Sequence, residues 1–200
     1  MNHSLAQKIY TKQGVTKENV FEHKKVLHIG CGNSKLPGAI GVDMLKMPAV
    51  DVVHDLDVYP WPFEDNSIDG LVAHSVMEHV TNIVSFFDEV SRISKQGARV
   101  VIEVPYFRCV DSFTDPTHKH FFTSASLDYF LENKNSLSGY GYSTYTYIKR
   151  GFWYGWPQQS SNLLVRWFKS YIEKHAHFYD QYLSMLFPVK VLFWELEVKK

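Results

Sequence analysis

The chain has 200 residues, 45% of them hydrophobic, which is enough to bury the core of one domain. Its 21 basic and 21 acidic residues balance without blocks of like charge, which argues against a nucleic-acid binder. No apolar run is long enough for a membrane span and no signal-peptide pattern opens the chain, so we expect a cytoplasmic protein without stable membrane insertion. The two cysteines, Cys31 and Cys109, suit a reducing compartment.

Residues 1–25 form a polar leader with a faint helical pattern at 5–10. We expect it either to cover the sheet edge or the ligand, or to remain loosely ordered. A buried strand follows at 26–29, and Gly30-Cys31-Gly32 comes directly after it.

Two glycines one residue apart, just past a strand, let the backbone pass close to a ligand, although ordinary tight turns use the same pattern. The next strand, 40–42, ends at Asp43, where a carboxylate is placed to hold a ribose hydroxyl pair. Lys35 stands where the dinucleotide fingerprint needs its third glycine, so a nucleoside without pyrophosphate fits better than NAD.

The middle of the chain predicts an α/β core. The link between the first two strands is too short for a crossover helix, so the first half should carry fewer helices than usual. The expected elements are a third strand at 51–54, a strand at 68–73, a helix at 83–93 and a strand at 99–104. The last three make a βαβ unit, so the sheet is at least partly parallel.

The second half is rich in aromatic residues. Its expected elements are a helix capped by residues 123–126, a strand at 140–148 interrupted by 152–157, apolar residues at helical spacing over 163–187, and a last strand at 189–198.

Four segments in register, VLHIGCG, GVD, PWPFEDNSIDGLVAHSVMEHV and EVSRISKQGARVVIEVP, resemble the class I S-adenosylmethionine-dependent methyltransferases, in particular the type 11 group. The resemblance covers about residues 26–105. It implies a Rossmann-like, seven-stranded, mostly parallel sheet with the last strand antiparallel. It also makes the strands at 140–148 and 189–198 the final hairpin, with a helical aromatic insert or cap at 150–188.

The resemblance also implies a cofactor, S-adenosyl-L-methionine, and the residues that bind it. Its methionine part would lie over Gly30, Cys31 and Gly32, and its sulfonium beside His74. Its ribose hydroxyls would bind Asp43, and its adenine would lie beside Met44, Asp55 and Leu56. Two positions depart from the family pattern, because His28 replaces an acid and Ser34 replaces a glycine.

The acceptor should lie outside the carboxyl ends of the strands, between the 106–120 loop and the insert. Apolar walls would come from Trp61, Tyr106, Phe107 and Trp153. Methyl transfer needs mainly alignment, and a base helps only where the nucleophile carries a proton. His118 and His120 are the candidate catalytic bases, with a loop-ordering role as the alternative. We give His79 a mainly structural role.

A metal site formed by Asp115, His118 and His120 has less support than a catalytic base, because the spacing of these residues matches no firm metal-binding signature. We therefore expect no metal. The aromatic insert is best explained as a helical cap, although weak peripheral contact with a membrane or a lipid-linked substrate would also use such residues.

The sequence thus predicts a single methyltransferase domain, residues 1–200, that methylates oxygen or nitrogen of a small or medium organic acceptor. The alternative is a catalytically silent module that binds S-adenosylmethionine or a partner on the same fold. The departures at His28 and Ser34 are its only support.

Overall fold

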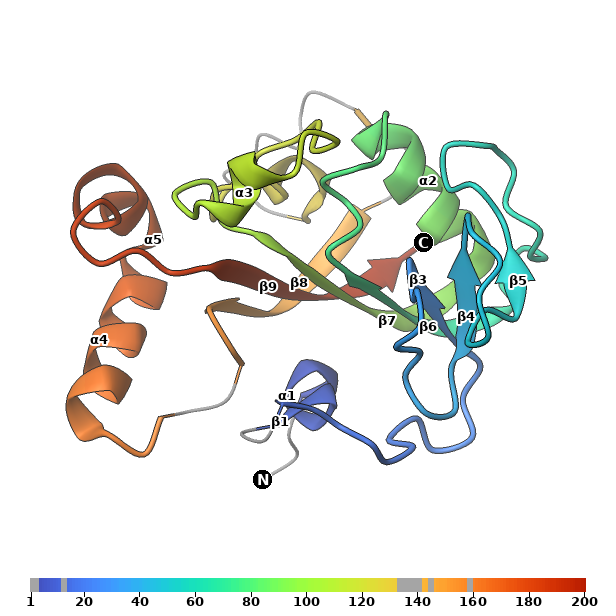
Figure 1. The fold of residues 1–200 in the computed structure, drawn as a ribbon, viewed down its shortest axis with the longest axis horizontal. Coiled ribbons are helices and arrows are strands. Elements are labelled where there is room, and N and C mark those ends of the chain that lie inside the picture. Colours follow the sequence, from blue (N-terminus) through green and yellow to red (C-terminus); the bar gives the residue numbers. More distant parts are fainter. Residues whose placement is uncertain (1–3, 12–13, 133–141, 144–145, 158–159) are drawn as a thin grey trace.

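A computed structural model of the chain describes residues 4–11, 14–132, 142–143, 146–157 and 160–200. Its main sheet has seven strands in the order β5-β4-β3-β6-β7-β9-β8, and β1 and β2 form a separate small hairpin (Figure 1). The strands are β1 (Tyr10–Thr11), β2 (Gly14–Val15), β3 (Val26–Ile29), β4 (Ile40–Asp43), β5 (Val52–Val53), β6 (Ile68–His74), β7 (Ser94–Pro105), β8 (Thr146–Tyr154) and β9 (Val191–Lys199).

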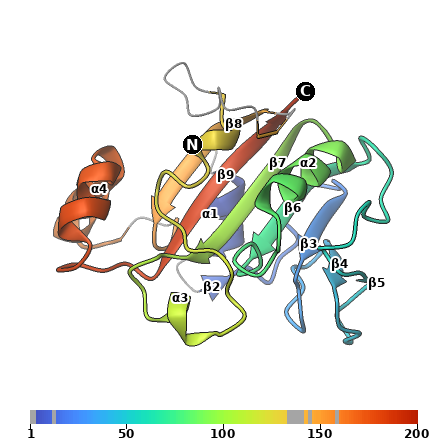
Figure 2. The ribbon, with the colours of Figure 1, turned by 90° about the horizontal axis from the view of Figure 1, so that it is seen from above.

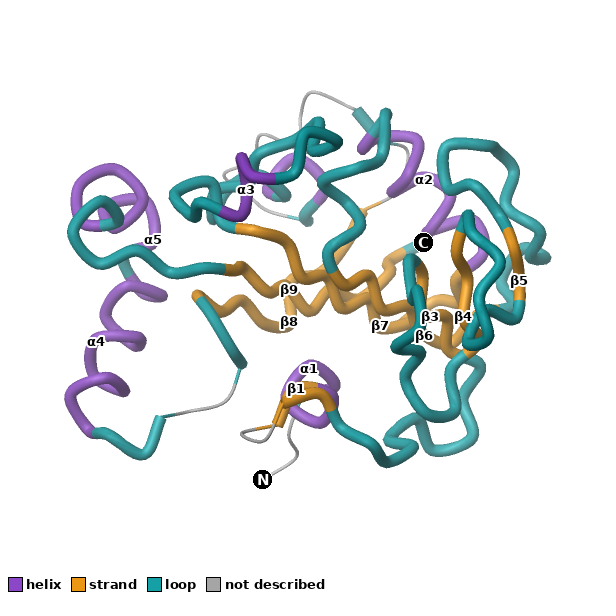
Figure 3. The backbone as a smooth tube through the Cα atoms, in the orientation of Figure 1, coloured by secondary structure: helices purple, strands orange, loops and turns teal. Residues whose placement is uncertain are grey.

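The helices are few in the first half of the chain. The α-helices are α1 (Leu5–Ile9), α2 (Ile83–Ile93), α3 (Asp111–Thr114), α4 (Leu163–Lys174) and α5 (Ala176–Phe178), with a 3₁₀ turn η1 (Asp128–Phe130) and a π-helical turn η3 (Tyr179–Leu183). Residues 30–67 are all described and contain no helix, as the short links predicted (Figure 3).

The pairing confirms the predicted fold class. β5, β4, β3, β6 and β7 run parallel, whereas β9 lies antiparallel to both β7 and β8. A mostly parallel sheet of seven strands, with one antiparallel strand inserted next to the edge, is the predicted Rossmann-like arrangement.

The sheet is covered on both faces, by α2 on one and by α1 on the other (Figure 1). Buried Phe86, Phe87, Val90 and Ile93 of α2 pack on one face, as the apolar stripe predicted. On the opposite face, Ala6, Ile9 and Tyr10 pack against Val26, Val72, Val101 and Phe193. The leader therefore supplies the layer that a crossover helix after β3 would otherwise provide.

A buried carboxylate fixes α1 to the sheet. Glu195 of β9 accepts hydrogen bonds from the backbone N–H groups of Leu5 and Ala6, at 3.2 and 3.1 Å. Ser4 and Gln7 complete a capping box at the same end. Since the first N–H groups of a helix have no partner within it, these contacts satisfy donors that would otherwise be buried unpaired.

The predicted strand at 140–148 is wrong in its boundaries. Residues 140–141 and 144–145 lie outside the described residues, and β8 continues through Phe152, Trp153 and Tyr154, where we expected an interruption. The cause is a cross-strand partner distant in sequence: Phe152 is opposite Trp194 of β9, with ring centroids 5.5 Å apart.

The helix predicted after residue 123 is only the short turn η1. The chain turns away because Leu131 forms a bridge with Tyr147 and the Glu132 N–H donates to the Tyr147 carbonyl at 2.8 Å.

The aromatic insert is helical but lies beyond the β8 side of the sheet, far from β5 (Figure 2). One buried carboxylate anchors it: Asp180 accepts from the hydroxyls of Tyr106, Tyr154 and Ser124, at 2.7, 2.6 and 2.7 Å, and from the Ser124 N–H at 2.9 Å. Among the described residues, no helix combines the length and apolarity needed to cross a membrane.

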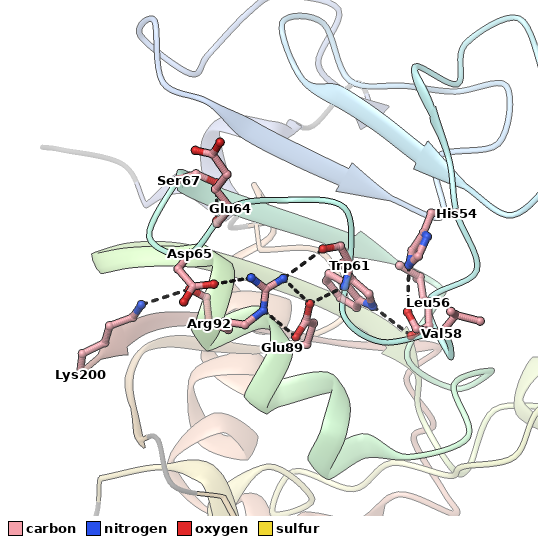
Figure 4. Close-up of polar contacts among 10 residues, drawn as sticks. All are labelled: His54, Leu56, Val58, Trp61, Glu64, Asp65, Ser67, Glu89, Arg92 and Lys200. Carbon is pink, nitrogen blue, oxygen red and sulfur yellow. Dashed lines mark hydrogen bonds and ion pairs between the residues drawn. The ribbon is translucent and has the colours of Figure 1, made fainter.

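Arg92 of α2 holds the PWPFEDNS segment against the core (Figure 4). Its guanidinium donates to the Glu89 carboxylate at 3.0 and 2.6 Å, to the Trp61 carbonyl at 3.0 Å, and to Asp65. Glu89 also accepts from the Trp61 N–H at 2.5 Å and is only 7% exposed. Arg92 thus neutralises a carboxylate that has almost no access to water.

Replacing Arg92 with Met should lower the free energy of unfolding by about 3 kcal/mol, because a buried charge would lose its partner. Lys95→Met is the matched control: Lys95 pairs with Asp69 while 48% of its side chain is exposed, so its loss should cost less than about 1 kcal/mol. Urea unfolding of both variants measures the difference. Equal stabilities would mean that the Arg92 pair contributes no more than a surface pair.

Candidate cofactor and acceptor site

The glycine loop after β3 is shaped by two residues with positive φ, Gly30 at 61° and Gly32 at 49°. The Gly32 N–H donates to Asp43 Oδ2 at 2.9 Å, and the Leu45 N–H donates to Asp43 Oδ1 at 3.0 Å. The Asp43 carboxylate therefore joins the loop after β3 to the turn after β4. A carboxylate can accept about four hydrogen bonds, so it retains acceptor capacity for a ligand.

The two glycines meet different surroundings. A Cβ at Gly30 would lie 2.1 Å from a methyl group of Val76, whereas a Cβ at Gly32 would meet nothing within 4 Å. Gly30 is needed for packing, and Gly32 borders open space. This agrees with a loop whose backbone is left accessible to a ligand at its second glycine.

A cavity of about 660 Å³ lies at the carboxyl ends of β3, β4, β5 and β6. Five of the predicted cofactor residues line it: Gly30, Asp43, Met44, Asp55 and Leu56. The sequence reasoning missed the rest of the wall: His54, Asp57, Ser75, Val76, His79, Val80, Thr117 and Lys119. Its position is where open α/β sheets bind their ligands.

Three predicted cofactor residues do not line this cavity. The Gly32 backbone borders open space beside it, as described above. The Cys31 side chain is buried under the loop, with Sγ 3.7 Å from the Gly32 carbonyl. His74 turns to the α1 face, where Nε2 lies 3.1 Å from Glu103 and Nδ1 lies 3.2 Å from the Tyr10 hydroxyl. Side chains alternate along a strand, so His74 shares the α1 face with Val72.

His28 supports the glycine loop from beneath. Its Nδ1 accepts the Leu36 N–H at 3.1 Å, and the ring is 6% exposed. Burial, and then the charge of His74, lowers the pKa of His28 to about 4. The ring is therefore neutral at neutral pH and keeps the lone pair that holds the loop.

Lys119 lines the cavity and joins two loops beside it. It donates to Thr81 Oγ1 at 2.8 Å and to Asp57 Oδ2 at 3.3 Å, and Asp57 also accepts the Thr81 N–H at 2.7 Å. The Thr117–Lys119 segment is thereby tied to the loop after β5. No short motif in the sequence marks this contact, because it joins residues 62 positions apart.

A second cavity, of about 580 Å³, adjoins the first and shares Ser75 and His79 with it. It lies between the residues after β6 and the loop after β7, and its other lining residues are Glu78, Pro105, Asp111, Thr114, Asp115, Pro116 and His118. The predicted acceptor loop therefore does face this space. The aromatic insert contributes none of the lining residues.

The two candidate bases differ in their surroundings. His118 lines the second cavity, and its Nδ1 donates to the Ser112 carbonyl at 2.9 Å, which leaves Nε2 with a lone pair. His120 lines neither cavity, and its Nε2 donates to the Val80 carbonyl at 2.9 Å. Of the two, His118 is the one that lines a cavity.

Glu78 lies beside His118 and is 1% exposed. Burial, and then the charges of Glu103 and Asp115, raises the pKa of Glu78 to about 8. Its Oε1 is 4.0 Å from His118 Nε2. His79 packs against His118 with ring centroids 4.7 Å apart, and burial is the main cause that lowers the pKa of His79.

The four residues predicted to wall the acceptor pocket lie outside this second cavity. Trp61 and Tyr106 are buried: the Trp61 indole donates to the Leu56 carbonyl at 3.1 Å, and the Tyr106 hydroxyl donates to Asp180. Phe107 lies under the Arg108 guanidinium, 4.6 Å from its ring centroid. Trp153 packs on the α1 face of the sheet. Their assignment to the acceptor pocket stays a prediction. The hydrogen bond of Trp61 supports the backbone of Leu56, which lines the first cavity.

Comparisons with known proteins agree with this geometry. Residues 39–102 match the family model of a methyltransferase domain. No curated protein matches the sequence significantly.

Solved structures share the fold at low sequence identity. An S-adenosylmethionine-dependent methyltransferase from Mesorhizobium loti has 12% identity and a TM-score of 0.53, over 87% of this chain and 90% of that one. One from Archaeoglobus fulgidus has 21% identity and a TM-score of 0.52, over 88% and 87%. The [4+2]-cyclase SpnF has 13% identity and a TM-score of 0.50, over 88% and 74%.

The chain has the fold of the class I S-adenosylmethionine-dependent methyltransferases, and residues 39–102 match a methyltransferase domain. The predicted fold is confirmed, and the matched domain supports the predicted family and cofactor. S-adenosylmethionine is the cofactor of that family, and the cavity beside the glycine loop has residues that fit it: remaining acceptor capacity at Asp43, open backbone at Gly32, and apolar walls.

Gly32→Val should abolish binding of S-adenosylmethionine, because the new side chain would occupy the open space in front of the loop. Gly97→Val is the control: Gly97 also has positive φ, at 78°, and open space around its Cβ position, but it lies at the start of β7, away from the cavity. Calorimetric titration of both folded variants measures the effect. Normal binding by Gly32→Val would refute the assignment of the loop.

Proposed function

We propose that this protein transfers the methyl group of S-adenosylmethionine to oxygen or nitrogen of a small or medium organic acceptor. The observation that carries the proposal is the pair of adjoining cavities, one beside the glycine loop and Asp43, the other beside His118, with Ser75 and His79 shared between them. A cofactor and an acceptor bound in these two spaces would meet near Ser75.

The first cavity would hold the cofactor as follows. Asp43 accepts hydrogen bonds from the ribose hydroxyls, Met44 and Leu56 enclose the adenine, and Asp55 accepts from its amino group. When bound, S-adenosylmethionine supplies an electrophilic methyl group on a positively charged sulfur. The backbone at Gly32 would let the methionine part approach closely, because a side chain there would occupy the open space in front of the loop.

The second cavity would hold the acceptor in line with the methyl group, since alignment supplies most of the rate gain in such a transfer. Where the acceptor atom carries a proton, the free Nε2 of His118 accepts it. His118 is oriented for this by the hydrogen bond from Nδ1 to the Ser112 carbonyl.

Binding of the cofactor tests the first half of the proposal. Asp43→Ala should weaken binding of S-adenosylmethionine by about 1.5–3 kcal/mol, the range for hydrogen bonds to a charged group. Calorimetric titration with S-adenosylmethionine and with S-adenosylhomocysteine measures it. Asp51→Ala, which removes an exposed carboxylate that pairs with Lys35 outside the cavity, serves as the control. Unchanged affinity in folded Asp43→Ala would contradict the ribose assignment.

Turnover tests the second half. With methyl-labelled cofactor and a panel of small phenols, carboxylic acids and amines, His118→Ala should lower the rate by about 10²–10⁴, the usual contribution of a base. His120→Ala should have a smaller effect, because its ring is bonded to the Val80 carbonyl away from both cavities. Cofactor affinity should stay near wild type in both. Cofactor binding without any turnover across the panel would favour the silent module, whereas full activity of both variants would leave alignment as the whole mechanism.

A further inference from the structure

Three side chains converge where the two cavities meet. Glu78, His79 and His118 each present a potential ligand atom, and these atoms lie within 4.8 Å of one another. Two of the residues follow β6, and the third comes from the loop after β7. From the sequence we expected no metal, and the weaker set that we considered was Asp115, His118 and His120, of which only His118 belongs to this cluster.

Hydrogen bonds fix both imidazoles in the same tautomer. The Thr117 hydroxyl donates to Asp115 at 2.7 Å, so it must accept from His79 Nδ1, which lies 2.9 Å away. His118 Nδ1 donates to the Ser112 carbonyl at 2.9 Å. In the neutral form of each ring, Nε2 is therefore the nitrogen without a proton. Tying the other nitrogen to an oxygen acceptor is how proteins orient metal-binding histidines.

The third group is an unpartnered buried acid. Glu78 is 1% exposed, and neither of its carboxylate oxygens forms a hydrogen bond with any residue that the structure describes. A buried polar group without a partner costs about 1–3 kcal/mol, and more when charged. His118 Nε2, 4.0 Å away, is too distant for a hydrogen bond. The site thus holds a buried carboxyl group that has no hydrogen-bond partner among the described residues.

We propose that Glu78, His79 and His118 bind a divalent transition-metal ion at the junction of the cofactor and acceptor cavities. Two imidazole nitrogens and one carboxylate form a ligand set that zinc and non-haem iron sites use, and it leaves coordination positions open. Ligand atoms within 4.8 Å of one another need only small side-chain rotations to reach about 2.0–2.2 Å from one ion.

All three residues line the cavity assigned to the acceptor, so an acceptor bound there would lie beside the ion. This role rests on the proposed function, whereas metal binding itself does not. An acceptor hydroxyl bound to the ion loses its proton to water more readily. Its oxygen then attacks the methyl carbon while the carbon–sulfur bond breaks, so the products are the methyl ether or ester, S-adenosylhomocysteine and one proton. The metal-bound form therefore suits oxygen acceptors, and in it His118 acts as a ligand.

The test is titration of metal-stripped wild-type protein with Zn²⁺ alone, with the bound metal counted by elemental analysis. We expect one tightly bound ion per chain. Glu78→Gln and His118→Ala should each weaken binding at least tenfold, because each removes one of three protein ligands. His177→Ala, which changes an exposed histidine outside the cluster, should bind as wild type. Circular dichroism confirms that the variants are folded, and His79→Gln provides a further ligand variant where one of them is not.

No stoichiometric binding, or binding that all variants retain, would overturn the proposal and indicate an adventitious ion only. Binding of S-adenosylmethionine, measured on the same samples, keeps the two proposals separate. A protein that binds Zn²⁺ through these residues but not the cofactor refutes the proposed function alone. One that binds the cofactor and methylates acceptors at the same rate with and without Zn²⁺, and binds no ion at the cluster, refutes the metal site alone.

Discussion

The central strands of this sheet must be covered on both faces, and the rest of the structure follows from how the chain meets that need. All four residues of β3 are buried, yet the link from β3 to β4 contains no helix. The N-terminal helix α1 takes that place, and Glu195 holds it there through two backbone N–H groups. Because Tyr10 then lies on the α1 face, it engages His74, and His74 in turn engages Glu103. These three polar side chains, which could have faced a ligand, instead interact with one another on the face of the sheet that α1 covers.

The same missing helix changes how the glycine loop is supported. A helix N-terminus after the loop would offer its own N–H groups and dipole to a ligand. Here side chains do the positioning: Asp43 accepts the Gly32 N–H and His28 accepts the Leu36 N–H. The second contact depends on a neutral imidazole, and burial of His28 keeps it neutral. The departure at His28 is thus explained by loop support, which removes it as an argument for a silent module.

The sequence predicted the fold well, and it placed the acid that ends β4 at the cavity, because both depend on local signals. The apolar stripe of α2, the strand after Ile68 and the acid ending β4 are each visible in a few consecutive residues. It failed where the outcome depends on a distant partner. β8 extends to Tyr154 because β9 pairs with it, and His74 faces α1 because of strand alternation. The hydrogen bond between Lys119 and Thr81 and the ring contact between His79 and His118 each join segments about 40 residues apart. No short motif reveals such contacts.

The two proposed roles of His118, proton removal and metal binding, would use the same lone pair, so they exclude each other. Glu78 distinguishes them. A free base at His118 gains nothing from a carboxylate 4.0 Å away that accepts no hydrogen bond from the described residues. An ion between them would satisfy that carboxylate and both imidazoles at once, and would offset the cost of burying the acid. The hydrogen bonds of His118 to Ser112 and of His79 to Thr117 hold the two imidazoles in the same tautomer, which would favour binding of an ion. The proposed ion would thus offset the free-energy cost of burying Glu78.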